Sequence, residues 1–226
     1  MKCKGHKPDS LIAETLGSNY ALGMSRTHVL SVACILSITL FVATATAQQP
    51  AAASEIHQIF VEDQKDRGVG AGVNAKWDDV SRRDKVRRER VNQLLTAGNI
   101  KTGQDYEDAA FVFQHGDSPD DYLLAHVLAM AAMERGNTRA KWIAAATLDR
   151  YLQAIKQPQV FGTQYLRPNE RTPFTQEPYN ASVLSDQLRA EFCVPDREEQ
   201  KSNAEALNKN APLPESTRLP RECRGQ

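Results

Sequence analysis

Two neighbouring segments of the chain, 120–135 and 138–156, have the residue pattern of helices that are apolar on almost every side. Such helices must be covered by other parts of a protein. Ser118-Pro119 precedes the first segment, and Gly136-Asn137 separates the two. A capping serine followed by proline is typical of a helix start, and a short connector places consecutive helices side by side in opposite directions. The two segments therefore predict an all-α fold with a buried central helix at 120–135.

Shorter amphipathic segments surround this pair. Ser54 and Thr102 are suitable N-caps, Asp105 can complete a capping box with Thr102, and Gly98 can end a helix. We expect a compact antiparallel helical bundle or a helix-hairpin array, although no repeat of fixed period is visible. The further predicted elements are helices at 54–67, 81–97, 102–114 and 182–192, and one short irregular or extended segment at 157–165.

The predicted helical domain covers residues 54–195. Before it lie an upstream extension (1–23), a signal peptide (24–47) and a Gln/Pro/Ala linker (48–53). Beyond residue 195, charged residues, Asn and Pro dominate, and apolar residues are sparse. Because such a composition buries too little apolar surface to order a chain, 196–226 is predicted to be a flexible, disordered tail.

Residues 24–47 have the three parts of a secretory signal peptide. Met24-Ser25-Arg26 is a basic start, 29–42 is an apolar run, and Ala45-Thr46-Ala47 is a small-x-small cleavage pattern. The run is short for a membrane span of about 20 residues. We therefore expect an exported protein, periplasmic or extracellular. The alternatives are an uncleaved anchor, which would be the protein's only contact with a membrane, and a lipoprotein site at Cys34.

The charge of the chain argues against nucleic acid as a partner. Basic and acidic residues both number 28, and cleavage after residue 47 leaves 24 basic and 26 acidic ones, a formal charge of −2. Surfaces that bind nucleic acid are strongly basic. The basic segment 82–90 contains acids and no aromatic residue, so we interpret it as a solvated helix face.

Cleavage would also leave only two of the four cysteines, Cys193 and Cys223. In an exported protein such a pair can form a disulfide that ties down the tail. Two free or separately buried thiols are the alternative, and the sequence does not decide between them.

Two acid–base pairs lie on the apolar sides of their helices. Asp63 and Arg67 share the face of Ile59, and Asp84 and Arg88 fall within the apolar arc of the next helix. On an exposed helix such a pair contributes only a few tenths of a kcal/mol, whereas on a buried face it needs further partners. The placement indicates either structural clamps between helices or the lining of a polar pocket.

Further candidate residues lie in and after the central helices. His115 stands at a predicted helix end, and its ring can change charge near neutral pH, as a proton carrier must. With Asp149 to orient it, His115 would form a catalytic general acid/base site without a metal. The candidate ligand-binding residues offer charged, amide or hydroxyl groups: Asp84, Arg88, Gln114, Arg150, Gln159, Thr163 and Gln164.

Three of these motifs occur together and in order: Gln114-His115, Asp149-Arg150-Tyr151-Leu152 and the segment 159–164, Gln-Val-Phe-Gly-Thr-Gln. In this combination the chain resembles a bacterial family of uncharacterised, often exported proteins marked by Gln-His, Asp-Arg-Tyr-Leu and Gln-x-x-Gly-Thr-Gln motifs. The resemblance covers roughly residues 56–195. It implies a mostly helical domain but no established activity, so it assigns no catalytic residue.

A structural interpretation of the same residues is equally simple. Gln114 and His115 would cap helix carbonyls, Asp149 and Arg150 would bridge helices, and 159–164 would satisfy a buried turn. The histidines and cysteines are not spaced as metal ligands, so no metal or other cofactor is expected. His126, on an apolar helix, is interpreted as a hydrogen-bonded core residue.

Two functions remain as hypotheses. The first is a helical binding or interaction module with a polar Gln/His/Asp/Arg pocket for a small-molecule, glycan or protein partner. The second is a metal-independent enzyme of the hydrolase type that uses His115 as general acid and base. Clustering of His115, Asp149, Arg150, Gln164, Asp84 and Arg88 in one solvent-reached cleft would favour a ligand or catalytic site, whereas dispersal of these side chains would leave a scaffold.

Overall fold

The computed structural model describes residues 54–67, 76–167, 169, 171–211 and 223. The predicted extension, signal peptide and linker lie outside these residues, as do 212–222 and 224–226 of the predicted tail. Within the described part, no helix combines the length and the apolar character that crossing a membrane requires.

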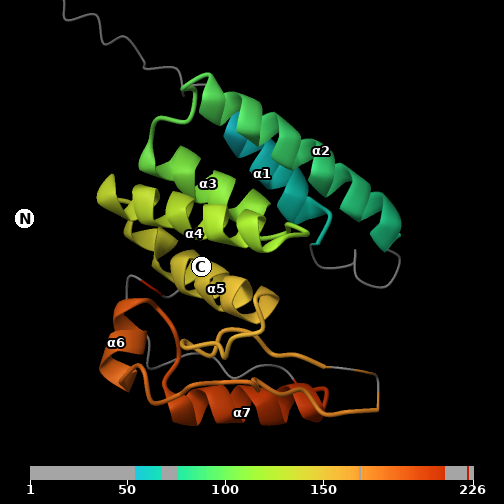
Figure 1. Ribbon diagram of the computed structural model, residues 1–226, viewed down its shortest axis with the longest axis vertical. Coiled ribbons are helices and arrows are strands. Elements are labelled where there is room, and N and C mark those ends of the chain that lie inside the picture. Colours follow the sequence, from blue (N-terminus) through green and yellow to red (C-terminus); the bar gives the residue numbers. More distant parts are fainter. Residues whose placement is uncertain (1–53, 68–75, 168, 170, 212–222, 224–226) are drawn as a thin grey trace, which may run out of the picture. The chain divides into compact units, whose positions relative to one another are not determined.

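The described residues form seven α-helices and no named strand, which confirms the all-α prediction (Figure 1). Only two isolated β-bridges occur among them, Gln159 with Tyr179 and Leu166 with Thr175. The predicted helix at 138–156 is divided between a 3-10 turn and α5. In chain order the elements are α1 (Glu55–Lys65), α2 (Trp77–Thr96), α3 (Gly103–Phe113), α4 (Pro119–Glu134), η1 (Thr138–Ala140), α5 (Lys141–Ala154), α6 (Asp186–Glu191) and α7 (Arg197–Asn208).

The predicted N-caps start their helices. Ser54 caps α1, and Thr102 and Asp105 form a reciprocal capping box at α3. Ser118 begins a second capping box at α4, with Pro119 in the first turn. Each cap satisfies backbone N–H groups that have no partner inside the helix, so these starts follow from short stretches of sequence.

Two helix starts differ from the prediction. α2 begins at Trp77 rather than at Ser81. α6 begins at Asp186 rather than at residue 182, because the Ser185 side chain accepts the N–H of Leu188 and caps the helix there. The capping serine therefore determines where α6 begins, and it lies three residues beyond the expected helix start.

Consecutive helices pack side by side. α4 lies between α3 and α5, and these are the most extensive helix–helix contacts of the described residues; α1 contacts α2 and α3, and α2 also contacts α3 (Figure 1). Small side chains at these contacts let helix backbones approach closely at native packing density. The fully buried alanines are Ala109, Ala110, Ala125, Ala129, Ala132, Ala140, Ala144, Ala145 and Ala146.

One side of α4 corrects the prediction of a helix covered all round. Leu128 faces the core, but Leu123, Val127 and Met130 are exposed. The three exposed residues are spaced by four and three positions, so they form one stripe along the helix. Apolar composition predicted burial of the whole helix, but it carries no information on which sides receive a neighbour.

The chain after α5 packs against that helix through a second apolar cluster. Phe161 and Val194 are buried with Ala145, and the ring of Phe192 lies 5.1 Å from that of Phe161, centroid to centroid. Trp142 is partly buried against both this cluster and the main core. The irregular segment is thereby attached to the helical core.

The prediction of a flexible tail is wrong over residues 197–208, which form α7. Gln200 in this helix is 1% exposed, and its Nε2 donates to the carbonyls of Phe161 (2.9 Å) and Pro195 (2.8 Å). A buried amide with satisfied hydrogen bonds anchors a segment whose composition offers little apolar surface. Composition alone did not reveal this anchor.

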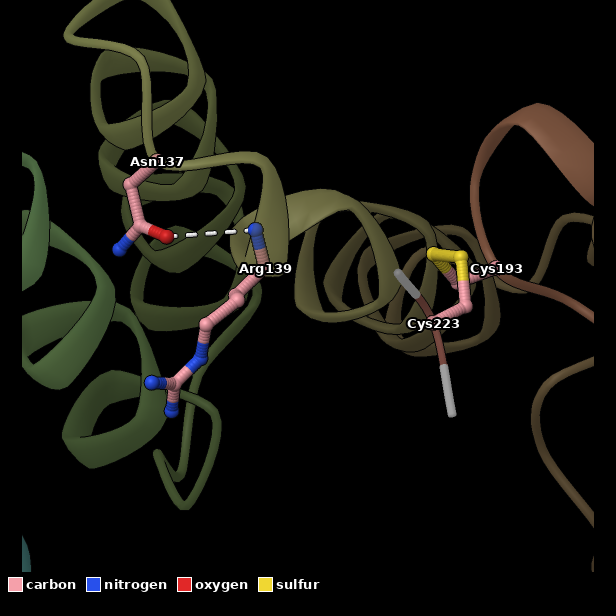
Figure 2. Close-up of a disulfide and its surroundings, with 4 residues drawn as sticks. All are labelled: Asn137, Arg139, Cys193 and Cys223. Atoms are coloured by element: carbon pink, nitrogen blue, oxygen red, sulfur yellow. Dashed lines mark hydrogen bonds between the residues drawn. A yellow bond between two sulfur atoms is a disulfide. The ribbon is translucent and has the colours of Figure 1, made fainter. Parts of the chain in front are cut away.

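Cys193 and Cys223 form a disulfide, with Cα atoms 5.4 Å apart (Figure 2). Of the two alternatives that the sequence left open, the structure has the bridge. It ties residue 223 to the chain just after α6, across a separation of 30 residues. Closing a loop of this length typically stabilises a fold by about 3 kcal/mol. Figure 2 also shows the Asn137 side-chain oxygen accepting the Arg139 N–H at η1.

Gly162 generates a prediction about the irregular segment. Its φ is +82°, and a Cβ would lie 2.7 Å from Cζ of Tyr179. We expect Gly162→Ala to lower the free energy of unfolding by roughly 2–4 kcal/mol, because left-handed backbone and overpacking both cost stability. Denaturant unfolding measures the loss.

Gly98→Ala is the matched control for this substitution. Gly98 has φ +68°, but a Cβ added there would have no atom within 4 Å. Only the backbone penalty of about 1 kcal/mol therefore remains in this variant. Equal losses in the two variants would contradict close packing as the reason for glycine at position 162.

Candidate functional site

His115 is held by a buried carboxylate. It follows Gln114, the C-cap of α3, and its Nδ1 lies 3.2 Å from Oδ1 and 3.1 Å from Oδ2 of Asp63 in α1. The Asp63 side chain is 0% exposed, whereas that of His115 is 16% exposed. A carboxylate on one ring nitrogen fixes the orientation of an imidazole and leaves the other nitrogen for a different partner. Asp63, not the predicted Asp149, is therefore the residue that orients His115.

The same carboxylate belongs to an ion-pair network between α1 and α2. Arg67 Nη1 donates to Asp63 Oδ1 at 3.0 Å, and the Arg67 guanidinium also pairs with Asp84. Arg87 Nη1 donates to Asp84 Oδ1 at 3.1 Å. Asp63, Asp84 and Arg87 are buried. Arg67 thus joins Asp63 of α1 to Asp84 of α2, as the clamp interpretation of the first acid–base pair predicts.

Arg88 does not pair with Asp84, which corrects the second predicted pair. Its Nη1 donates to the backbone carbonyl of His115 at 2.7 Å, and its guanidinium forms ion pairs with Asp117 and Asp121. Although spaced for an i,i+4 pair, the two side chains are drawn to different neighbours. Arg88 thus holds the turn between α3 and α4, and with it the backbone of His115, against α2.

Asp66 extends the network toward solvent. Arg83 Nε donates to it at 2.8 Å and Arg87 Nη2 at 2.6 Å. The hydrogen bond from Arg83, assisted by Arg87, lowers the pKa of Asp66 from 3.8 to about 2, although burial acts in the opposite direction. The carboxylate therefore stays charged at neutral and mildly acidic pH.

Asp149 has a different role from the one predicted. Its Oδ1 accepts the backbone N–H groups of Val160 (2.8 Å) and Phe161 (3.0 Å), and its Oδ2 accepts the N–H and the hydroxyl of Thr163 (2.9 and 2.8 Å). Four donors satisfy a carboxylate that is 0% exposed. Asp149 anchors the segment after α5 and does not contact His115.

The Gln-x-x-Gly-Thr-Gln element is held together by its own side chains. Gln159 Oε1 accepts the N–H of Gln164 at 3.0 Å, and Gln159 Nε2 donates to the Gln164 carbonyl at 2.9 Å. Gln164 Nε2 donates to Thr163 Oγ1 at 2.9 Å. These contacts support the structural interpretation of Gln159, Thr163 and Gln164 as groups that satisfy a buried turn.

Gln114 and Arg150 differ from the other candidates. Both are at least partly buried, yet within the described ranges neither side chain has a hydrogen bond or an ion pair. The structure therefore divides the predicted site residues. Arg88 contacts the backbone of His115, and Asp84 is connected to His115 through Arg67 and Asp63. Asp149 belongs to the loop anchor, so the predicted clustering of His115 with Asp149 is not observed. Gln114 and Arg150 have side chains without a described partner.

Sequence analysis missed a second histidine–carboxylate contact. His57 Nδ1 lies 2.8 Å from Oδ2 of Asp108, and so connects α1 to α3. Burial raises the pKa of Asp108, while the hydrogen bond from His57 opposes this rise. His126 Nδ1 lies 2.9 Å from the Ala144 carbonyl, so the predicted hydrogen bond is present, but the residue is only partly buried. Asp63 was recognised on an apolar face, but nothing in the sequence indicates which histidine it meets.

The surface beside the network is grooved. One groove is lined by Glu62, Asp79, Arg82, Arg83, Val86 and Arg87, so Arg87 connects it to the buried carboxylates. Another is lined by residues of the loop at 167–174 and of the end of α7. Among the residues placed by the structure, no three His, Cys, Asp or Glu side chains are grouped to hold a metal ion.

Comparison of the chain with protein-family models, with curated proteins and with solved structures found no match. The resemblance expected from the three motifs is therefore still a hypothesis, and functional inference rests on the geometry of this chain.

Asp84 tests the buried network. We expect Asp84→Asn to lower the free energy of unfolding by about 2–3 kcal/mol, because Arg67 and Arg87 would lose the charge that balances them. Asp79→Asn, which breaks the exposed pair with Arg82, should change stability by about 0.5 kcal/mol or less. Chemical denaturation compares the two. Intact stability in Asp84→Asn would refute the clamp.

Asp66 predicts a pH dependence of stability. Because the pKa of Asp66 is lower in the folded state than its ordinary value of 3.8, protons bind the unfolded chain first. The stability due to this group is present above about pH 4 and is lost as the pH falls toward 2. Denaturation midpoints measured over this range should fall less steeply in Asp66→Asn than in the wild type. Superimposable profiles would remove Asp66 as a source of acid sensitivity.

Proposed function

We propose that the mature protein is an exported binding module built on an antiparallel helix-hairpin array, with its ligand site at His115. One observation carries this proposal: a partly exposed imidazole is held in place by a fully buried carboxylate, Asp63. No hydrogen bond to Nε2 of His115 occurs within the described ranges, so this nitrogen is available to a ligand. Gln114 adds an amide with no described partner next to it in the chain.

The surrounding network supports recognition of a polar ligand. The carboxylates of Asp63 and Asp84 are balanced by the guanidinium groups of Arg67 and Arg87, so the network positions His115 without placing a large net charge around it. Arg88 holds the backbone of the same residue. A residue whose ring and backbone are both already held in place loses little conformational entropy when it binds a ligand. A small molecule or a glycan fragment with hydrogen-bonding groups fits such a site best.

The disulfide supports export. Disulfides persist in oxidising compartments and are rare in the cytosol. The Cys193–Cys223 bridge therefore agrees with the signal peptide proposed for residues 24–47 and with a periplasmic or extracellular location.

A metal-independent hydrolase is the second candidate. The same observation favours it, since a histidine oriented by a buried carboxylate is the arrangement of a general base. Asp63 takes the orienting role that was expected of Asp149. His115 would remove a proton from water through Nε2 and return a proton to the leaving group.

A binding screen tests the first function and discriminates it from the second. Metabolites and glycan fragments are screened against the mature protein by ligand-observed NMR, and each hit is titrated with His115→Ala. We expect at least about tenfold weaker binding in this variant, because a hydrogen bond at the centre of the site is lost. Conversion of a hit to product during the titration would identify the hydrolase.

His57→Ala is the matched control. It also removes a histidine paired with a buried aspartate, but at the other contact between α1 and α3. Binding should survive in His57→Ala. The absence of any ligand for the wild type, or equal loss in both variants, would refute a site at His115.

A further inference from the structure

Arg150 in α5 is a cation without a counter-ion. Its Nε is sealed from solvent and has no hydrogen-bond partner. Across the described part of the chain, no hydrogen bond or ion pair is found for the rest of the guanidinium either. Buried charges in proteins are normally paired, because an unpaired charge loses its favourable interaction with water and gains no other interaction in its place. A partly buried guanidinium whose Nε has no partner is therefore a feature that needs a reason.

The neighbours of Arg150 do not supply a negative charge. Burial lowers the pKa of Arg150, Tyr122 acts in the opposite direction, and the positive charge of Arg67 lowers it further. Arg67 already shares the carboxylates of Asp63 and Asp84. Neither of these carboxylates is paired with Arg150.

Gln153 provides a second unpaired donor on the same helix. Its Nε2 is also sealed from solvent without a partner. Residues three apart on a helix are neighbours on one face, so Gln153 lies one turn from Arg150 on the same side of α5. Two adjacent hydrogen-bond donors without a described acceptor are suited to bind a group that carries several acceptor oxygens.

The two residues are connected to the proposed ligand site. Arg67, which lies close enough to influence Arg150 electrostatically, donates to Asp63, the residue that orients His115. Tyr122, the other neighbour of Arg150, donates its hydroxyl hydrogen to the Gly116 carbonyl at 2.7 Å, one residue beyond His115. Arg150 is therefore electrostatically coupled to two residues, Arg67 and Tyr122, whose hydrogen bonds reach Asp63 and the turn after His115.

We propose that Arg150 and Gln153 form an anion-binding subsite, which takes the carboxylate or phosphate group of the small molecule whose other end contacts His115. This inference rests on the proposed function. The guanidinium fork matches two oxygens of one oxyanion, and a charge-assisted hydrogen bond is about twice as strong as a neutral one. Rotation of the two side chains, which is common when ligands bind, brings their sealed nitrogens to the anion.

The test follows the side-chain nitrogen directly. The mature protein, labelled with ¹⁵N-arginine, is titrated separately with inorganic phosphate and with acetate, while sodium chloride keeps the ionic strength constant. The Arg150 Nε–H resonance is identified by its absence in Arg150→Lys. We expect a saturable shift of this resonance with one or both anions, and the stronger of the two identifies the acid group. Acetate represents a carboxylate, and phosphate represents a phosphoryl group.

Substitutions give the quantitative part of the test. Arg150→Gln should weaken binding of the effective anion at least about tenfold, because the charge and the fork are both lost. Gln153→Leu should weaken it less, and it provides an independent measurement if Arg150→Gln fails to fold. Arg82→Gln, which removes an exposed arginine, should leave binding unchanged. A loss in Arg82→Gln equal to that in the other variants would show general charge screening and overturn the subsite.

The outcomes separate the two proposals. A ligand that depends on His115, together with no saturable shift of Arg150 by either anion, overturns the anion subsite and leaves the proposed function intact. A saturable shift that requires higher anion concentrations in Gln153→Leu supports the subsite. If that shift occurs in a protein for which the metabolite screen finds no His115-dependent ligand, the subsite stands and the proposed contact at His115 fails.

Discussion

The buried carboxylate of Asp63 governs the arrangement of the groups around the site. It is fully inaccessible to solvent, and it meets Arg67 from its own helix and His115 from the end of α3. Burying a carboxylate is unfavourable unless charged or hydrogen-bonding groups surround it. Because this carboxylate needs such partners, α1, α2 and the turn after α3 pack around it. The hydrogen bond to this carboxylate also fixes the ring of His115, and this fixed ring is the basis for the proposed ligand site.

Asp149 satisfies the same physical requirement in another way. Its oxygens accept hydrogen bonds from three backbone N–H groups and one hydroxyl in the segment 160–163, with no cation involved. Asp63 therefore organises charged groups near solvent, and Asp149 organises a loop. Both are buried acids on apolar helix faces, but of the two only Asp63 contacts the partly exposed ring of His115. Arg150, next to Asp149 in the chain, differs from both because it is only partly buried and its sealed Nε has no described partner.

Several features could be predicted because their causes are local. The caps at Ser54, Thr102 and Ser118 involve residues within one helical turn, and the alanine-rich faces of the central helices follow from spacing alone. Other features depend on distant groups. α7 was missed because its anchor, Gln200, bonds to the carbonyl of Phe161, 39 residues away. The open side of α4 was missed because hydrophobicity does not reveal where a neighbour is lacking.

The helical class, most of the helix starts and the presence of acids on apolar faces follow from the amino-acid order, since they depend on residues a few positions apart. The pairing of each acid with its base does not, and it was settled by the packing of the helices. Asp63 and His115 are separated by 52 residues, so only the contact of α1 with α3 brings them together. The packing likewise selected a disulfide over two free thiols, because a bridge requires two distant Cα atoms to approach to 5.4 Å.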